Sequence, residues 1–196
     1  MKEESPDKRW AKILAEYLDR FKIKLPKFPL ALDVGCGNAA VWNYLGLVHY
    51  LQSRDLGVPH YVAVDKDEKA FQRAKAQLGD LITFLACDAR QLDQHIHGRF
   101  SLAVSTHPEL TTSPEGPRIW REIFSQIAGL LAPRGCLIVT SFWLQDHIPA
   151  QVAVGQAGFQ ILYSGTNRYP GKRFDTASNG EQLQYDKYIL IGRRRL

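Results

Sequence analysis

The segment Ala31-Leu-Asp-Val-Gly-Cys-Gly-Asn-Ala-Ala40 decides the fold of this 196-residue chain. Residues 30–34 form a short apolar run with the length of a strand, and Gly35 and Gly37 follow it directly, before a stretch with helical spacing. Glycines at such a turn adopt backbone angles closed to other residues, and they let a ligand approach the main chain. The pattern therefore predicts a strand, turn and helix with a nucleotide-like cofactor at the carboxyl end of the strand.

Strands and helices alternate along the rest of the chain. The predicted strands are 61–64, 81–85, 100–105, 136–142, 159–163 and 184–191, and the predicted helices are 39–53, 67–78, 119–132 and 148–157. This alternation indicates βαβ units and a mostly parallel sheet. Since only a polar loop, about 165–181, separates the last two strands, we expect them to pair antiparallel. The prediction is a doubly wound, seven-stranded α/β sheet with helices on both faces.

Residues 1–29 are expected to form an N-terminal helical extension and linker, and residues 30–196 the cofactor-binding domain. Ser5 suits the N-cap of the first helix, and Pro6 suits its first position. Apolar residues from Trp10 to Phe21 then recur at helical spacing. Pro26 and Pro29 mark the linker that follows.

Composition indicates an ordinary soluble domain, because 45% of the residues are hydrophobic and 23% are charged. No apolar run reaches the length of a membrane span, and the charged N-terminus does not resemble a secretory signal. Cys36, Cys87 and Cys136 lack metal-ligand spacing, so we expect no metal and reduced thiols in a cytoplasmic protein. The net charge of +5 is compatible with an anionic partner such as RNA, but also with a plain solvated surface.

The spacing of Gly35, Gly37 and Ala40 also fits the dinucleotide fingerprint, so NAD must be distinguished from other cofactors. Asp33 would repel a pyrophosphate, and it would attract a cofactor with a positive amino group and a sulfonium. Residues 131–142, LAPRGCLIVTSF, predict a helix end followed by a buried strand. The final antiparallel pair is absent from ordinary dinucleotide domains. These features disfavour an NAD-linked oxidoreductase, which stays as an alternative.

The segment Leu32-Asp33-Val34-Gly35-Cys36-Gly37 resembles the first motif of the class I S-adenosylmethionine-dependent methyltransferases. Residues 131–142 resemble their strand-five segment, with Arg134 replacing the first of two paired glycines. The resemblance covers roughly residues 30–191 and implies a Rossmann-like methyltransferase domain. Its implied reaction moves a methyl group from S-adenosylmethionine to an O, N or C nucleophile and releases S-adenosylhomocysteine.

The resemblance also implies a cofactor site. Its residues would be Asp33, Gly35, Cys36, Gly37, Asn38, Asp65, Lys66, Asp88, Ala89, Ser105 and Thr106. Asp33 and the glycine turn would hold the methionine part of the cofactor. Asp65 would accept hydrogen bonds from the ribose hydroxyls, which suits a carboxylate facing a diol. Asp88 would lie near the adenine amino group.

His107 and Glu109 are the candidate catalytic residues, because they follow the fourth strand at the edge where ligands bind. Histidine titrates near neutral pH and suits acid–base work. The alternative for both is an ordinary loop position. Four aromatic residues are candidates for the wall of an acceptor pocket: Trp42, Tyr50, Trp120 and Trp143, of which Trp143 is favoured.

The acceptor is not specified by the sequence. A chain without an appended nucleic-acid module favours a small molecule, and RNA is the second choice. A catalytically silent binding protein with a methyltransferase fold is a third alternative. The arginines at 193–195, with Arg168, Lys172 and Arg173 of the polar loop, could contact phosphates, but we expect a solvated tail. The oligomeric state is left open.

Overall fold

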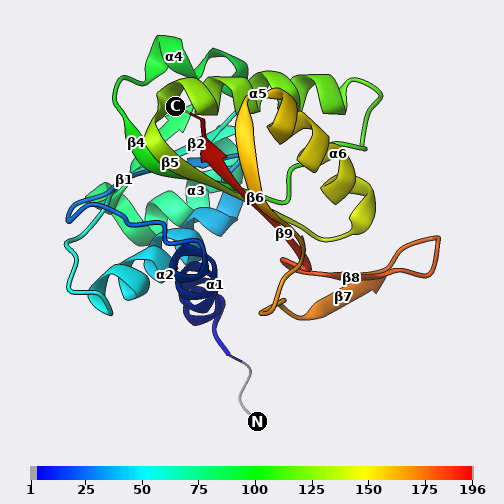
Figure 1. The fold of residues 1–196 in the computed structure, drawn as a ribbon, viewed down its shortest axis with the longest axis horizontal. Coiled ribbons are helices and arrows are strands. Elements are labelled where there is room, and N and C mark those ends of the chain that lie inside the picture. The colour runs from blue at the N-terminus through cyan, green and yellow to red at the C-terminus, as the bar shows by residue number, and fades with distance from the viewer. Residues whose placement is uncertain (1–3, 196) are drawn as a thin grey trace.

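The predicted sheet is present and lies between two layers of helices (Figure 1). The computed structural model describes residues 4–195. The sheet contains β1 (Leu30–Val34), β2 (His60–Asp65), β3 (Thr83–Ala86), β4 (Phe100–Thr106), β5 (Leu131–Ser141), β6 (Phe159–Thr166) and β9 (Tyr188–Arg194). Their order is β3-β2-β1-β4-β5-β9-β6. The fold class expected from the sequence is therefore confirmed.

Strand order reverses between β1 and β4, which are parallel neighbours in the centre of the sheet. The chain moves outward from β1 through β2 to β3, and it then returns to the other side of β1. In open α/β sheets such a switch point leaves a crevice at the carboxyl ends of the strands, where ligands bind. The glycine turn follows β1 at this edge.

The last two strands of the large sheet pair antiparallel, as expected. Strand β9 lies between β5 and β6 and runs antiparallel to both. Its residues Ile189, Leu190 and Ile191 are fully buried and alternate between the two faces of the sheet. A continuous apolar run suits a strand that is covered on both faces.

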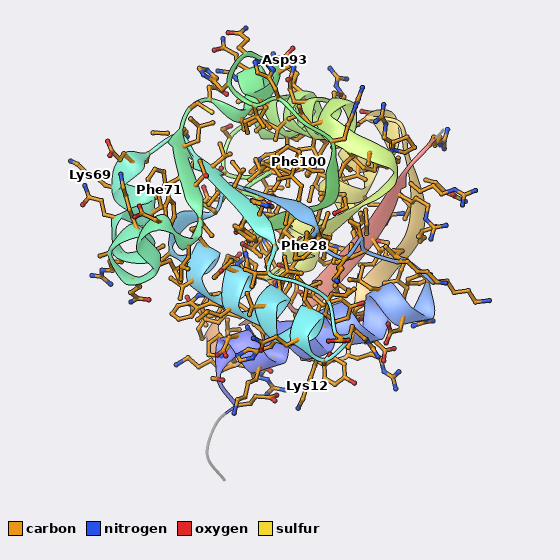
Figure 2. The ribbon with its side chains drawn as sticks, turned by 90° about the vertical axis from the view of Figure 1, so that its left-hand side faces the viewer. Lys12, Phe28, Lys69, Phe71, Asp93 and Phe100 are labelled. Carbon is orange, nitrogen blue, oxygen red and sulfur yellow. The ribbon has the colours of Figure 1, made fainter. Side chains whose placement is uncertain are left out.

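The helices are α1 (Pro6–Arg20), α2 (Ala40–Gln52), α3 (Glu68–Leu78), α4 (Leu92–His95), α5 (Gly116–Leu130) and α6 (Leu144–Gln156). Helices α1, α2 and α3 pack on one face of the sheet, and α4, α5 and α6 pack on the other. In Figure 2, Lys12, Lys69 and Asp93 lie at the periphery, whereas Phe71 and Phe100 point into the two interiors. Asp67 caps α3 through its side chain, which accepts a hydrogen bond from the Lys69 amide.

Helix α1 shares the core of the main domain. Its residues Trp10, Ile13, Leu14, Tyr17 and Leu18 are buried in the same cluster as side chains of α2 and of the sheet. The division of the chain at residue 29 stays a prediction, but the packing surface of α1 is continuous with the domain.

The polar loop expected at about 165–181 contains part of a hairpin that the sequence did not predict. Strands β7 (Arg173–Thr176) and β8 (Gln182–Gln184) pair antiparallel and project from the lower right of the ribbon in Figure 1. Between them lies the turn Ala177-Ser-Asn-Gly180, and Gly180 has a φ of +82°. Serine, asparagine and glycine are residues that such turns favour. The exposed, polar strands lacked the apolar alternation that identifies a strand.

The arginines at the chain end do not form the expected solvated tail. Arg193 and Arg194 belong to β9 and are half-buried. Their guanidinium groups donate to the backbone oxygens of Phe21 and Leu131 respectively. Residue 195 is exposed, as a solvated terminus would be.

Among residues 4–195, no helix is both long enough and apolar enough to cross a membrane.

Helices α1 and α2 cross at Gly46, where a side chain has no room. A Cβ atom at Gly46 would lie 2.7 Å from the Asp7 carbonyl oxygen and 2.7 Å from the Trp10 Cβ. We expect Gly46→Ala to lower the free energy of unfolding by about 1–3 kcal/mol, because overpacking outweighs the better helix propensity of alanine. Denaturant unfolding followed by circular dichroism measures this change.

Gly129→Ala is the matched control, since Gly129 is an exposed helical glycine whose Cβ would meet nothing within 4 Å. This variant should be neutral or up to about 1 kcal/mol more stable. Equal effects in the two variants would contradict the crossing at Gly46.

Candidate active site

The glycine turn after β1 is held against the end of β2. The backbone amides of Gly35 and Cys36 both donate to the Val64 carbonyl oxygen, and the Gly37 amide donates to Asp65 Oδ2 at 3.0 Å. Gly35 and Gly37 have φ angles of +68° and +45°, which other residues rarely adopt. A 3-10 helix at Gly37–Ala39 then leads into α2. The turn thus has the backbone conformation that its two glycines predicted.

A cavity of about 430 Å³ lies beside this turn, at the carboxyl ends of the parallel strands. Its lining includes eight of the residues predicted for the site: Gly35, Asp65, Lys66, Asp88, Ala89, Thr106, His107 and Glu109. They come from the ends of β1, β2, β3 and β4. The volume is in the range of small-molecule sites. We call this space the strand-end cavity.

Two half-buried carboxylates of the strand-end cavity, Asp65 and Asp88, differ in their partners. Asp65 accepts from the amides of Gly37 and Asp67, and each of its oxygens retains a free lone pair. Asp88 accepts from the guanidinium and the amide of Arg90. The hydrogen bonds from Arg90 outweigh partial burial and hold the pKa of Asp88 below its usual value. Asp88 is therefore an ionised acceptor at neutral pH.

Trp120 of α5 covers the glycine turn. A Cβ built on Gly35 would lie 3.3 Å from its Cη2 atom. The ring is half-buried and also packs against Phe124 at a centroid distance of 5.5 Å. Trp120 lines the strand-end cavity, and its role as a wall of an acceptor pocket stays a prediction.

Asp33 does not line either site cavity. Its side chain is fully buried, and its Oδ2 accepts from Asn43 Nδ2 at 3.0 Å and from the Tyr61 hydroxyl at 2.8 Å. Its Oδ1 is buried without a hydrogen-bond partner among the described residues. Burial is the largest influence on this carboxyl group and raises its pKa to about 6. Asp33 is thus a buried hydrogen-bond acceptor beneath the turn. A cation at the turn would stabilise the ionised form of its carboxyl group.

The remaining predicted cofactor residues are divided. Cys36 and Ser105 are buried, and neither side chain lines the strand-end cavity. Burial raises the pKa of the Cys36 thiol well above its usual value, so it is not a nucleophile. Gly37 does not line the strand-end cavity, but its amide donates to Asp65, which does. Asn38 lines a different cavity.

A second cavity of about 860 Å³ lies on the other side of His107. Its walls are the start of α1, the start of α2 and the segments that flank the β7–β8 hairpin. They include Arg9, Asn38, Trp42, Lys172 and Tyr185. Thr106 and His107 line both cavities. We call the second space the hairpin cavity.

His107 is held at this boundary by a buried carboxylate. Its Nε2 lies 3.0 Å from Asp186 Oδ1, and its ring stacks on Phe142 with a centroid distance of 3.8 Å. No hydrogen bond within residues 4–195 involves its Nδ1. His107 and Asp186 have positive φ angles of 58° and 49°, a sparsely populated conformation for such residues. The Asp186 backbone nitrogen also lies 3.2 Å from Nε2, so Asp186 fixes this ring nitrogen through its amide or its carboxylate, according to the tautomer of the ring.

Asp186 joins three distant segments. Its Oδ2 pairs with Arg9 Nη2 of α1 at 2.7 Å, and its Oδ1 accepts from the Thr140 hydroxyl of β5 at 2.8 Å. Burial raises the pKa of Asp186, but the hydrogen bond from His107, the charges of His107 and Arg9, and the Thr140 hydroxyl outweigh burial and lower its pKa overall. Asp186 is therefore ionised beside His107.

Glu109 occupies a different position from His107. It is exposed on the loop after β4 and lines only the strand-end cavity. Asp146 holds this loop by accepting from the amides of Leu110 and Thr111. The indole of Trp143 also donates to Asp146, so Trp143 supports the loop and lines neither cavity.

Sequence reasoning missed Arg9, Asn43 and Asp186. Asn43 carried a signal, since it is a polar residue on the buried side of an apolar helix. Arg9 and Asp186 are 177 residues apart and lie on segments without a motif. Only their convergence in space identifies them. Of the aromatic candidates, Trp42 lines the hairpin cavity and Tyr50 belongs to the core.

The chain is similar to several solved methyltransferase structures. The N-methyltransferase NodS from Bradyrhizobium japonicum WM9 has 15% sequence identity, with 98% of this chain and 99% of that chain covered at a TM-score of 0.61. CalS10 from Micromonospora echinaspora, an amino pentose methyltransferase, has 13% identity, 94% and 91% coverage and a TM-score of 0.62. A methyltransferase from Methanosarcina mazei has 16% identity, 92% and 98% coverage and a TM-score of 0.60.

No curated protein sequence matches the chain. The family model described as a methyltransferase domain matches residues 32–139, which is more than half of the chain. This range includes Asp33 and the whole glycine turn. It also includes residues 131–139 of the second segment that carried the resemblance. The chain therefore belongs to the class I S-adenosylmethionine-dependent methyltransferases, whose methyl donor is S-adenosylmethionine.

Proposed function

We propose that this enzyme methylates a small molecule that binds in the hairpin cavity while the cofactor binds in the strand-end cavity. One observation carries the proposal: the two cavities meet at Thr106 and His107. A donor and an acceptor bound on either side of these residues would be neighbours. Holding two reactants in this way supplies much of the rate enhancement of a transfer reaction.

The residues of the strand-end cavity fit S-adenosylmethionine. Asp65 would accept the ribose hydroxyls, and Asp88 would accept the adenine amino group if Arg90 shares it. The unpartnered Oδ1 of Asp33 supplies negative charge beneath the turn, which favours the cationic methionine part. When bound, the cofactor supplies an electrophilic methyl group on a sulfonium.

His107 is proposed as the base that takes the acceptor's proton. In the tautomer whose Nε2–H donates to Asp186 Oδ1, Nδ1 would accept this proton from an N–H or O–H nucleophile, and the ionised Asp186 would stabilise the resulting imidazolium. Thr106 Oγ1 is buried without a hydrogen-bond partner in the described chain and lines both cavities. It is available to position the nucleophile.

The walls of the hairpin cavity favour a small molecule over RNA. They contain two aromatic side chains that are partly exposed, Trp42 and Tyr185. Of the two cations, Arg9 is already paired with Asp186, and only Lys172 remains for a phosphate. Enclosure with a few polar groups is typical of small-ligand sites. NodS is an N-methyltransferase and CalS10 is an amino pentose methyltransferase, which supports an amino acceptor.

Thermal unfolding with S-adenosylhomocysteine tests the cofactor site, with NAD as the control ligand. At about 100 times its dissociation constant, a ligand adds roughly 2.7 kcal/mol, which raises the Tm by about 5–10 °C for a chain of this size. We expect a shift with S-adenosylhomocysteine and none with NAD. Release of S-adenosylhomocysteine with small amines and alcohols then tests the acceptor. A thermal shift without turnover on any acceptor would favour a silent binding protein.

The pKa of Asp33 predicts how cofactor affinity depends on pH. Because burial disfavours its ionised form, protonation of Asp33 stabilises the folded chain; this benefit is complete below pH 3.8 and lost as the pH rises through about 6. The ionised form, in turn, attracts the α-ammonium group, which S-adenosylmethionine and S-adenosylhomocysteine share. Titration calorimetry should therefore show S-adenosylhomocysteine binding roughly tenfold more tightly at pH 8 than at pH 5.

In Asp33→Asn this pH dependence should disappear, because the amide cannot ionise but still accepts from Asn43 and Tyr61. Asp65→Asn is the matched control and should weaken binding at both pH values alike. An unchanged pH dependence in Asp33→Asn would show that another group causes it.

The base role predicts different effects of two substitutions. His107→Asn keeps a residue type that tolerates positive φ but removes the imidazole, so kcat should fall by about 10²–10⁴-fold and the acidic limb of the pH–rate profile should vanish. Glu109→Gln should change kcat less than threefold. Asp186→Asn should move the acidic limb to lower pH, because the imidazolium loses its anionic partner. A His107→Asn enzyme with a wild-type pH profile would exclude His107 as the base.

A further inference from the structure

A groove lined by cations lies at the edge of the sheet opposite to the active site. Its volume is about 1060 Å³. Seven of its lining residues carry positive charge: Lys22, Lys24, Arg99, Arg134, Arg193, Arg194 and Arg195. They come from the loop after α1, the starts of β4 and β5, and the end of β9. We call this feature the basic groove.

The basic groove is separate from the methyl-transfer site. Ser101, near the start of β4, lines the groove, whereas Thr106 at the end of the same strand lines both site cavities. Five residues of extended strand span about 17 Å. A molecule in the groove would therefore lie at the opposite end of the strands from the reacting atoms. It would be a different molecule from the methyl acceptor.

The charges of the groove are not neutralised by the protein. No Asp or Glu side chain lines it, and none of the seven cations forms an ion pair in the part of the chain that the structure describes. Arg193, Arg194 and Arg99 instead donate to backbone carbonyl oxygens. The whole chain has only five more Lys and Arg than Asp and Glu, so its positive excess is concentrated in this groove.

An exposed aromatic ring lies in the same groove. Phe28 is 61% exposed, and its ring rests on Gly57, where a Cβ would approach the ring to 2.1 Å. Phe28 lies two residues before the start of β1. Gly57 also donates its amide to the Lys27 carbonyl oxygen at 2.7 Å. The ring is thus held against Gly57, and the Lys27 ammonium lies over it, 5.7 Å from the ring centroid.

We propose that the basic groove binds single-stranded nucleic acid. Its five arginines suit phosphates, which they contact bidentately, and Phe28 offers a stacking surface for a base. A cationic groove with an aromatic platform is the combination that binds single strands without sequence preference. A membrane would require the cations on a projecting surface, and an acidic polypeptide would leave the ring without a planar partner.

Fluorescence anisotropy with labelled U20 RNA and dT20 DNA tests this site on the full-length protein. The groove variant combines Lys24→Gln, Arg134→Asn and Arg195→Gln, which are exposed positions; asparagine suits the positive φ of Arg134. We expect roughly tenfold to hundredfold weaker binding at 0.1 M salt, and a slope of log K against log salt that is smaller by about 2. Phe28→Ala should weaken binding several-fold with an unchanged slope.

The matched control carries the same loss of charge on α3: Lys69→Gln, Arg73→Gln and Lys75→Gln. These side chains are exposed, and Lys69 projects outward in Figure 2. The control should change affinity less than threefold, and both triple variants should keep the thermal shift with S-adenosylhomocysteine. Tighter binding of U20 than of dT20 would identify RNA, and equal binding would identify the phosphate backbone as the shared ligand.

Three outcomes would overturn the proposal. The first is an equal loss of affinity in the two triple variants, which would mean that net charge alone attracts the strand. The second is no binding of either oligonucleotide at 50 mM salt. The third is stronger retention of the protein by phosphatidylglycerol vesicles, or by polyglutamate, than by U20.

Discussion

The ion pair between Asp186 and Arg9, with His107 on the same carboxylate, is the interaction on which the active site depends. It joins the first helix, the end of β4 and the segment before β9, which are remote in sequence. An unpaired buried carboxylate would be costly, so the three segments must meet for this one to be tolerated. All three segments contribute walls of the hairpin cavity, together with the start of α2.

Asp33 differs from Asp186 because its buried carboxyl group has no cationic partner among the described residues. It is buried with two neutral donors and one unpartnered oxygen, and no cation compensates its charge within the described chain. The fold thereby holds a carboxyl group whose ionised form is unfavourable until positive charge arrives at the glycine turn. An ionised Asp33 would lower the stability of the folded chain and raise its proposed affinity for a cationic ligand. Groups with shifted pKa values often lie at functional sites.

The polarity of the parallel sheet separates two chemistries. At the carboxyl ends of the strands, glycine amides, carboxylates and His107 surround two adjoining cavities. At the amino ends, loops and the end of the antiparallel β9 gather arginines around the basic groove. Strand β9 contributes to this asymmetry because it runs against its neighbours and so delivers the chain end to the amino edge. A parallel last strand would have placed residues 193–195 beside the active site.

The sequence by itself determined the doubly wound sheet, its antiparallel strand and the strand-end cavity. These follow from local signals, because apolar periodicity defines the strands, and residues that end parallel strands must meet at one edge. Asp65, Asp88 and Thr106 were assigned by the resemblance to the methyltransferase family, and the turn at Gly35 and Gly37 was found from its backbone requirement. What each contributes to cofactor binding stays a prediction.

Only the tertiary structure decided which side chains face a cavity and which are buried. Asp33 is on β1 and Ser105 is on β4, and both side chains are fully buried. A small difference in depth below the strand ends therefore keeps both side chains out of the strand-end cavity. The tertiary structure also produced the pairing of Arg9 with Asp186 and the gathering of seven cations from four segments. Such contacts join residues of large sequence separation, and no local pattern encodes them, because they depend on the packing of the entire chain.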